Sequence, residues 1–226
     1  MKYDQLKYRF KNTIAIRFCL ISFFIFIGGI FPLSATVIPG AARFAEYVPA
    51  LKGKQVALVA NHTSIIENVH LLDTLLSQGL NIKKIFAPEH GFRGNAANGE
   101  HVSDDIDPKS GLPIVSLYGK QKKLNSKELK NIDAIIFDMQ DVGVRYYTYL
   151  TTLHYIMEAC AENDIALWVL DRPNPNGHYV DGPVLDPKFT QSMVGLHPIP
   201  LVHGMTLGEL AMMIQGEKWM SKSHKL

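Results

Sequence analysis

Three side chains with acid–base and anion-binding chemistry stand close together in the chain: Glu89, His90 and Arg93. They follow a short run of β-branched and aromatic residues, 82–86, that is typical of a buried strand. Pro88 ends this strand, because its ring removes a backbone donor. In open α/β sheets, ligands bind just beyond the carboxyl ends of the strands. We therefore interpret this segment as a candidate site, with a solvated loop that holds a structural ion pair as the alternative.

Polar residues also follow the other strands that the sequence predicts. These strands span residues 55–60, 82–86, 114–117, 134–137 and 166–170, with a short sixth strand at 199–202. After them come Asn61 and His62, Glu89 and His90, Tyr118, Asp138, Gln140 and Asp141, Asp171, Arg172 and Asn174, and finally His203. Each has a local alternative role, such as an Asx-turn or a helix cap. Together, at one edge of a sheet, they predict a single pocket.

Helical patterns alternate with these strands. We expect helices at 69–78, 146–163 and 207–215, a short helix within 37–49, and a helical turn begun by Asn125 or Ser126. Thr206 and Glu209 have the spacing of a capping box at the start of the last helix, and residues 95–111 read as a long polar loop. The alternation predicts an α/β fold, with a mostly parallel sheet and helices on both faces.

Three familiar chemistries fit this pattern poorly. No glycine-rich phosphate loop follows residues 55–60, which argues against a dinucleotide cofactor. No Gly-x-Ser-x-Gly turn is present, which weakens acyl-transfer mechanisms. A metal-dependent hydrolase remains an alternative, but its candidate ligands lack the i, i+4 or Cys-x-x-Cys spacing of a specific metal site. Those candidates are His62, His90, His203, Asp138 and Asp171.

Carboxylate chemistry fits best. Glu89, beside apolar neighbours at a strand end, is the candidate general acid or base, and glycosidic cleavage often pairs such a group with a second carboxylate. Asp138 and Asp141 are the candidates for that second role. The run that contains Tyr146 and Tyr149 offers aromatic faces and hydroxyl groups to a sugar, although we expect at least one of these two tyrosines to be core.

Residues 1–36 differ in composition from the rest. Five basic residues against Asp4 give a net charge of +4 before an uncharged apolar run at 18–33, and Ser34 and Ala35 follow. This is the layout of a secretory signal peptide cleaved near Ala35. The apolar run is shorter than the ~20 residues of a spanning helix, but an uncleaved membrane anchor stays an alternative. We expect an exported protein, periplasmic or extracellular.

Charge and cysteine content narrow the partners. Since the whole chain carries +2 and its first segment +4, residues 37–226 carry −2 and offer no basic tract for nucleic acid. Membrane contact is expected only through the N-terminal segment, if it is not cleaved. Cys160 alone remains after that segment, so no internal disulfide forms, and we expect it to be a buried small hydrophobe. The sequence does not indicate an oligomeric state.

Six ordered motifs resemble the exo-β-N-acetylmuramidase family, the NamZ-type peptidoglycan hexosaminidases. The motifs lie at residues 37–40, 59–64, 87–94, 137–143, 170–175 and 202–206, and the resemblance runs from Val37 to about Trp219. It implies a Rossmann-like domain, no cofactor, and release of terminal N-acetylmuramic acid from the non-reducing ends of peptidoglycan fragments. The family's Pro-Glu-His-Gly glutamate corresponds to Glu89.

The chain departs from the family in two places. His62 follows Asn61, where the family is expected to have glutamine. The family also continues into a smaller second domain that closes the cleft, whereas residues 220–226 do not look like that continuation. We therefore expect a signal segment at 1–36, a Rossmann-like catalytic domain at 37–219 and a non-family tail. Half a cleft would bind sugar weakly and exclude water poorly, so a non-catalytic wall-binding remnant is a further alternative.

These considerations give a set of expected site residues. Glu89 and Asp138 are the expected catalytic pair. Arg172 or Arg145 is expected to pair with the lactyl carboxylate of the sugar, since guanidinium offers it a bidentate fork. The residues expected to bind substrate are Asn61, His90, Arg93, Gln140, Asp141, Arg145, Tyr149, Asp171, Arg172, Asn174 and His203.

Overall fold

The computed structural model describes residues 37–93, 105–118, 122–190 and 192–221. The chain divides into a unit at Met1–Val37 and a second unit at Ile38–Leu226, and the second is described here. The expected export segment and most of the expected loop at 95–111 lie outside the described residues. Within the described part, no helix has both the length and the apolar character needed to cross a bilayer.

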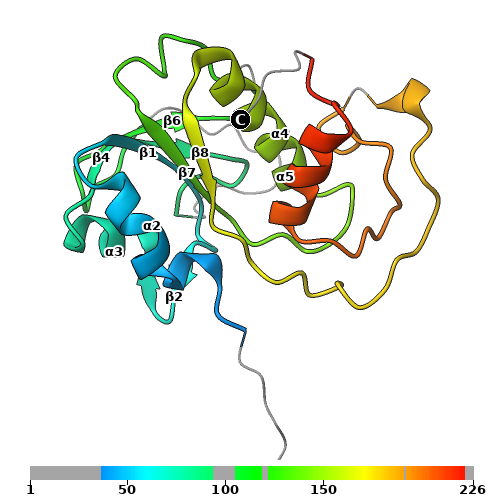
Figure 1. Cartoon of the computed structure of the whole chain (residues 1–226), viewed down its shortest axis with the longest axis horizontal. Helices are drawn as coiled ribbons and strands as arrows, with labels where there is room; N and C mark the ends of the chain where they lie inside the picture. Colours follow the sequence, from blue (N-terminus) through cyan, green and yellow to red (C-terminus); the bar gives the residue numbers. More distant parts are fainter. Residues whose placement is uncertain (1–36, 94–104, 119–121, 191, 222–226) are drawn as a thin grey trace, which may run out of the picture. The chain divides into compact units, whose positions relative to one another are not determined.

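A six-stranded sheet forms the centre of the fold (Figure 1). Its strand order is β5-β6-β4-β1-β7-β8, and all neighbours pair in parallel except the edge strand β5. The bounds are β1 Gln55–Ala60, β4 Asn81–Ala87, β5 Asp105–Ile106, β6 Pro113–Ser116, β7 Ala134–Asp138 and β8 Ala166–Val169. The prediction of five main strands in a mostly parallel sheet is confirmed, with strand ends displaced by one residue.

Helices cover both faces of this sheet, as predicted. The helices are η1 Gly40–Ala42, α2 Phe44–Leu51, α3 Leu71–Ser77, α4 Thr148–Asn163, η2 Pro187–Phe189 and α5 Leu207–Gly216. Alternate residues of β1 point to opposite faces: Val56 and Leu58 pack with α2 and α3, and Ala57 and Val59 pack with α4 and α5. Figure 1 shows the two pairs of helices on opposite sides of the sheet. Cys160 lies buried in the second of these cores, as expected.

Two strand predictions were wrong. Residues 199–202 do not form a strand; only Val202 makes isolated antiparallel bridges, to Val144 and to Asp181. Pro198 and Pro200 have no backbone N–H, so a longer ladder cannot form here. Conversely, β5 lies within the region expected to be loop, and it is too short to leave a periodic pattern in the sequence.

The helix starts were also corrected. Residues Val69–His70 form β3 and pair with β2, Ile65–Ile66, in a short hairpin, so α3 begins two residues later than predicted. His70 caps α3, because its Nδ1 atom accepts the Leu72 N–H at 3.2 Å. The predicted capping box of α5 is confirmed: Thr206 accepts from the Glu209 N–H, and the Glu209 carboxylate accepts from the Thr206 N–H.

Candidate functional site

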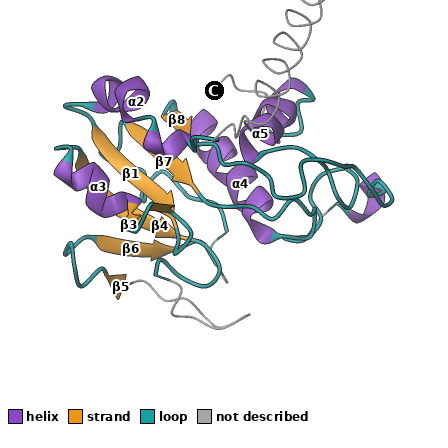
Figure 2. Ribbon diagram, turned by 90° about the horizontal axis from the view of Figure 1, so that it is seen from below, coloured by secondary structure: helices purple, strands orange, loops and turns teal. Residues whose placement is uncertain are grey.

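The strand order reverses its direction at β1. From β1 the chain moves to β4 and β6 on one side, then returns to β7 and β8 on the other. Such a reversal is the topological switch point at which doubly wound sheets bind ligands, beyond the carboxyl ends of the strands. The order β6-β4-β1-β7-β8 also corresponds to the 3-2-1-4-5 order of Rossmann-like sheets. In Figure 2 the arrowheads of β1 and β7 lie side by side, and these two strands meet at this point.

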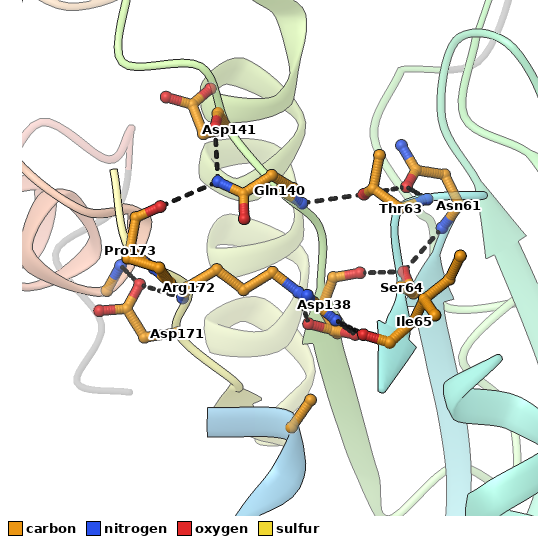
Figure 3. A network of polar contacts seen from close by, with 12 residues as sticks. Asn61, Thr63, Ser64, Ile65, Asp138, Gln140, Asp141, Asp171, Arg172 and Pro173 are labelled. Carbon is orange, nitrogen blue, oxygen red and sulfur yellow. Dashed lines mark hydrogen bonds and ion pairs between the residues drawn. The ribbon is translucent and has the colours of Figure 1, made fainter. Parts of the chain in front are cut away.

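Polar groups link the ends of β1 and β7 across the switch point (Figure 3). The Asn61 Oδ1 atom accepts hydrogen bonds from the Thr63 N–H at 2.9 Å and from the Thr63 hydroxyl at 2.6 Å. The Gln140 N–H donates to Thr63 Oγ1 at 3.0 Å, and the Gln140 side-chain amide donates to the carbonyl groups of Asp141 and Pro173. Asn61 and Gln140 thus lie in one network, as the sequence predicted for strand ends that share an edge.

Glu89 stands half-buried in the turn after β4, where two hydroxyl groups approach its carboxylate. The Thr148 hydroxyl, on the first residue of α4, donates to Glu89 Oε2 at 3.1 Å. The Tyr118 hydroxyl, from the end of β6, also approaches Glu89, and this carboxylate raises the pKa of Tyr118. The turn itself is sharp, because His90 and Gly91 both adopt left-handed conformations, with φ of 72° and 75°. For histidine this conformation is strained, and such strain gathers at functional sites.

Four buried side-chain atoms in the described residues have no hydrogen-bond partner. They are Asn61 Nδ2, Asp141 Oδ1, the Tyr149 hydroxyl and His203 Nε2. Buried polar atoms without partners are rare and call for a functional or structural explanation. All four belong to residues that the sequence predicted for the site: Asn61 and Asp141 follow strands, Tyr149 lies in the first turn of α4, and His203 precedes α5. The distribution is therefore that of a ligand site rather than of scattered packing defects.

Tyr149 reaches from α4 toward the end of β1. Burial raises its pKa, the neighbouring Tyr147 and the Glu89 carboxylate raise it further, and the Asn61 amide opposes the shift. The side chain is 1% exposed, whereas that of Tyr146 is 54% exposed. The expectation that one of these two tyrosines is core is confirmed, and the core tyrosine is the one whose hydroxyl lies near both Asn61 and Glu89.

Asp141 and His203 form a second buried pair. Their Oδ2 and Nε2 atoms are 3.6 Å apart, and the two residues are 5% and 2% exposed. His203 Nδ1 accepts the Met205 N–H, so the proton of a neutral His203 ring lies on Nε2, which faces the carboxylate. Asp141 Oδ2 also accepts the Gly143 N–H at 2.8 Å. The pair therefore joins the turn after β7 to the loop before α5.

Asp138 and Arg172, by contrast, form an ion pair with each other. Arg172 Nε donates to Asp138 Oδ1 at 2.6 Å and Arg172 Nη2 to Asp138 Oδ2 at 2.9 Å, and Nη2 also reaches the Ile65 carbonyl (Figure 3). Burial raises the pKa of Asp138, and the guanidinium opposes that shift. The structure therefore differs from our expectation of Asp138 as a free catalytic group and Arg172 as a clamp for a sugar carboxylate.

The other two arginines are also held by protein groups. Arg93 makes a bidentate pair with the buried Asp107, with Nε to Oδ1 at 2.8 Å and Nη2 to Oδ2 at 2.9 Å. This is the structural ion pair that we considered as the alternative for the loop after β4, and it holds the pKa of Asp107 down at about 2. Arg145 Nη1 donates to the carbonyl groups of Pro183 and Ile199. Arg93 and Arg145 therefore hold loops of the protein together.

Asp171 and Asn174 hold backbone groups. Asp171 Oδ1 accepts the Gly208 N–H at 2.8 Å and Oδ2 accepts the Thr206 hydroxyl at 2.6 Å, so Asp171 caps the start of α5. Asn174 donates to the Met205 carbonyl and accepts the Asn176 N–H. A helix cap was among the local alternatives for these polar residues, but the helix that Asp171 caps is remote in the sequence.

The structure thus separates the predicted residues into two groups. Asn61, Gln140, Asp141, Tyr149, His203 and Glu89 carry the site, with His90 in its turn, whereas the three arginines, Asp138, Asp171 and Asn174 support it. Thr63 and Thr148 were not among the predicted site residues. A hydroxyl at the first position of a helix that follows a strand end is the signal that could have found Thr148. In the described residues, no three His, Cys, Asp or Glu side chains gather as a metal site.

Fold and site together define an α/β protein of Rossmann-like strand order with a carboxylate-centred site at its switch point. The sequence profile of the family "Exo-beta-N-acetylmuramidase NamZ, N-terminal" matches residues 56–226, and the chain belongs to this family. The match includes residues 220–226, which we expected to fall outside it.

Similar proteins agree on this family. The chain is 47% identical over 175 residues to the peptidoglycan beta-N-acetylmuramidase NamZ of Bacillus subtilis (strain 168), covering 76% of this chain and 42% of that protein. Crystal structures of two DUF1343 family proteins of Bacteroides fragilis NCTC 9343 are also similar. One has a TM-score of 0.75 and 50% identity, covering 84% of this chain and 50% of that one. The other has a TM-score of 0.74 and 38% identity, covering 81% and 47%. The chain therefore spans about half the length of these relatives.

Proposed function

We propose that this chain is the Rossmann-like part of an exo-acting β-N-acetylmuramidase that releases terminal N-acetylmuramic acid from the non-reducing ends of peptidoglycan fragments. The observation that carries the proposal is the placement of Glu89. Its carboxylate lies at the carboxyl edge of the sheet, where the Thr148 hydroxyl donates to it and the Tyr118 hydroxyl approaches it, next to the switch point. The 47% identity to a peptidoglycan muramidase covers this region and supports the reaction class.

In this proposal, Glu89 exchanges a proton with the glycosidic oxygen. A glycosidase commonly uses a second carboxylate or a group of the substrate itself. Since both oxygens of Asp138 accept from Arg172, Asp141 is the better placed of the two carboxylates that follow β7. One of its oxygens has no partner, and the other lies 3.6 Å from the His203 imidazole.

We also propose that the protein acts outside the cytoplasm. The basic segment followed by the apolar run at 18–33 supports export, and peptidoglycan lies where such a segment would deliver the chain. Fractionation of cells that express the tagged chain tests this point. Recovery in the periplasm or medium is expected, and recovery only in the cytoplasm would overturn it.

The reaction itself is tested by incubating the purified chain with a disaccharide that carries N-acetylmuramic acid at its non-reducing end. Free N-acetylmuramic acid, measured by chromatography, is the expected product. A matched disaccharide with N-acetylglucosamine at that end should release far less sugar. Retention of the product yield in a chelator is expected as well, and its loss, restored by added metal, would instead favour the metal-dependent hydrolase.

A binding experiment distinguishes an enzyme from the non-catalytic wall-binding remnant. If the chain binds muramic-acid-ended fragments in calorimetry but releases no sugar over days, the enzymatic proposal fails for this chain and the wall-binding alternative is supported. If it neither binds nor cleaves them, the proposed substrate class fails too.

A further inference from the structure

The Glu89 carboxylate is bracketed by hydroxyl groups from two elements that lie far apart in the sequence. Thr148 comes from the first turn of α4 and donates to Oε2 at 3.1 Å. Tyr118 comes from the end of β6, two strands from β1, and its hydroxyl approaches the same carboxylate, which raises the pKa of Tyr118. Neither contact can follow from local sequence, since 59 residues separate Glu89 from Thr148. Both contacts are to the one side chain that the proposed reaction needs.

We propose that Tyr118 and Thr148 are positioning residues, whose hydroxyl groups hold the Glu89 carboxylate in one orientation. The inference rests on the proposed function for the role of Glu89, and it adds what fixes that side chain. The N-terminal end of the 16-residue helix α4 adds to this hold, because its partial positive charge attracts a nearby anion.

The two hydroxyl groups limit the orientations of the Glu89 carboxylate. Thr148 engages Oε2, and its own place is fixed because the Thr152 hydroxyl donates to the Thr148 carbonyl at 3.1 Å within the helix. A carboxylate held in this way has fewer orientations to lose when it reacts, and small displacements of a catalytic group are costly. The hydroxyl groups themselves need not touch the substrate, so they act through Glu89.

Other titratable groups lie in the same region. The charge of Glu89 raises the pKa of Tyr149, on α4, and Tyr147 contacts Tyr149 ring to edge with centroids 4.7 Å apart. His90 is the next residue in the turn, with a left-handed backbone. Arg93, later in the same turn, has its guanidinium on Asp107. The variants below leave these residues unchanged, so that a change can be assigned to the hydroxyl removed.

The test compares Tyr118→Phe, Thr148→Val and Thr148→Ser with the parent chain, and Tyr179→Phe serves as the control. Phenylalanine keeps the ring of Tyr118 and removes only the hydroxyl, and serine keeps the donor of Thr148. Tyr179 is 41% exposed and lies outside the bracket. Carbon-13 labelling of the glutamate carboxyl groups gives an NMR signal for each carboxyl group at pH 7, and Glu89→Gln identifies the Glu89 signal by its disappearance.

Removing a donor lets the Glu89 carboxylate take other orientations. We expect the Glu89 carboxyl signal to shift and broaden in both Tyr118→Phe and Thr148→Val, whereas Thr148→Ser and Tyr179→Phe should leave it unchanged. In Glu89→Gln, the phenol titration of Tyr118 should move to lower pH, because the carboxylate that raises its pKa is gone. A Glu89 signal that is unchanged in both Tyr118→Phe and Thr148→Val would overturn the bracket.

The NMR experiment needs no turnover, so its failure is distinct from failure of the proposed function. Where the chain releases N-acetylmuramic acid, kcat should fall roughly tenfold in Tyr118→Phe and Thr148→Val, with KM little changed. Thr148→Ser should keep the parental kcat. If Thr148→Val does not fold, Tyr118→Phe and the reciprocal titration in Glu89→Gln still decide the outcome.

Discussion

Arg172 and Asp138 meet beside the switch point through two parallel hydrogen bonds, Nε to Oδ1 at 2.6 Å and Nη2 to Oδ2 at 2.9 Å. The Asp138 side chain is fully buried and that of Arg172 is 9% exposed. The pair fastens the end of β8 to the end of β7, and through the Ile65 carbonyl it also holds the hairpin that follows β1. It therefore supports the site rather than offering a charge to a ligand.

Replacement of Arg172 by alanine should destabilise the fold strongly. The variant leaves a buried carboxylate without its partner, and removing one partner of a buried pair costs about 3–5 kcal/mol in the free energy of unfolding. Urea unfolding followed by circular dichroism measures the loss. Arg43→Ala is the control, since Arg43 pairs with Glu46 at the surface, where such pairs contribute under about 1 kcal/mol.

Two further measurements separate this role from a clamp on the sugar. Adding Asp138→Ala to Arg172→Ala should cost less than the sum of the two single variants, because the unpaired charge is removed. Cleavage of muramic-acid and N-acetylglucosamine substrates should decline in parallel in the stable fraction of Arg172→Ala. A selective loss with muramic acid, in a chain of unchanged stability, would restore the lactyl clamp.

Gly143→Ala should disturb the turn between β7 and α4. Gly143 has φ of +81°, and a Cβ atom there would lie 2.1 Å from Asn174 Oδ1, so both the backbone and Asn174 must shift. Gly79→Ala is the matched control, because Gly79 has φ of +79° and a Cβ atom added there would meet nothing within 4 Å. We expect about 1–2 kcal/mol of destabilisation in the control from backbone strain. A clearly larger loss is expected at Gly143, and equal losses in urea unfolding would contradict it.

Acid should destabilise the protein through a buried cluster on α4. His197 Nε2 and His154 Nδ1 are 2.9 Å apart, and Glu158 accepts from Lys123 and from the Ser221 N–H. Burial lowers the pKa of His154, and burial together with His154 lowers the pKa of His197 to about 3. Although burial opposes it, the bonds from Lys123 and Ser221 lower the pKa of Glu158 to about 2.

The lowered pKa values of His154, His197 and Glu158 determine how stability changes with pH. Each group binds its proton less readily in the folded state than in the unfolded state, so its stabilisation is complete above its ordinary pKa and declines as pH falls. For His197 the window runs from about 6.5 down to about 3, with a slope of up to about 1.4 kcal/mol per pH unit. Urea unfolding between pH 7 and pH 4 should show a smaller slope in His197→Gln than in the parent. His62→Gln, at an exposed position, should keep the parental slope, and an unchanged slope in His197→Gln would refute the assignment.

Glu89→Gln should abolish most of the turnover without unfolding the chain. Loss of a general acid or base lowers kcat by ~10²–10⁴, while glutamine keeps an oxygen that accepts from Thr148. Release of N-acetylmuramic acid from a chromogenic glycoside measures the rate. Glu67→Gln, at an exposed position outside the site, controls for the loss of one charge. Near-parental turnover in Glu89→Gln would remove Glu89 from the mechanism.

The sequence was sufficient to predict the sheet, its helices and the edge that holds the polar residues. Apolar runs such as 55–60 and 134–137 identify buried strands because burial of neighbouring side chains is a local requirement. The capping box of α5 is local too, since Thr206 and Glu209 are three residues apart. The prediction of a strand at 199–202 was wrong, because Pro198 and Pro200 cannot donate the backbone hydrogen bonds of a strand, although the segment is apolar.

Residue types and order alone therefore determined that Asn61, Glu89, Gln140 and Asp141 come to one edge of a parallel sheet. Only the tertiary structure decided what each polar side chain does there. A guanidinium binds a protein carboxylate as readily as a sugar carboxylate. In the folded chain, Arg172 pairs with Asp138, which lies 34 residues away in the sequence. Likewise, Thr148 contacts Glu89 only because α4 packs on the sheet with the first turn of the helix beside the end of β4. Such pairings depend on distances between segments remote in the chain, which no local pattern of residues contains.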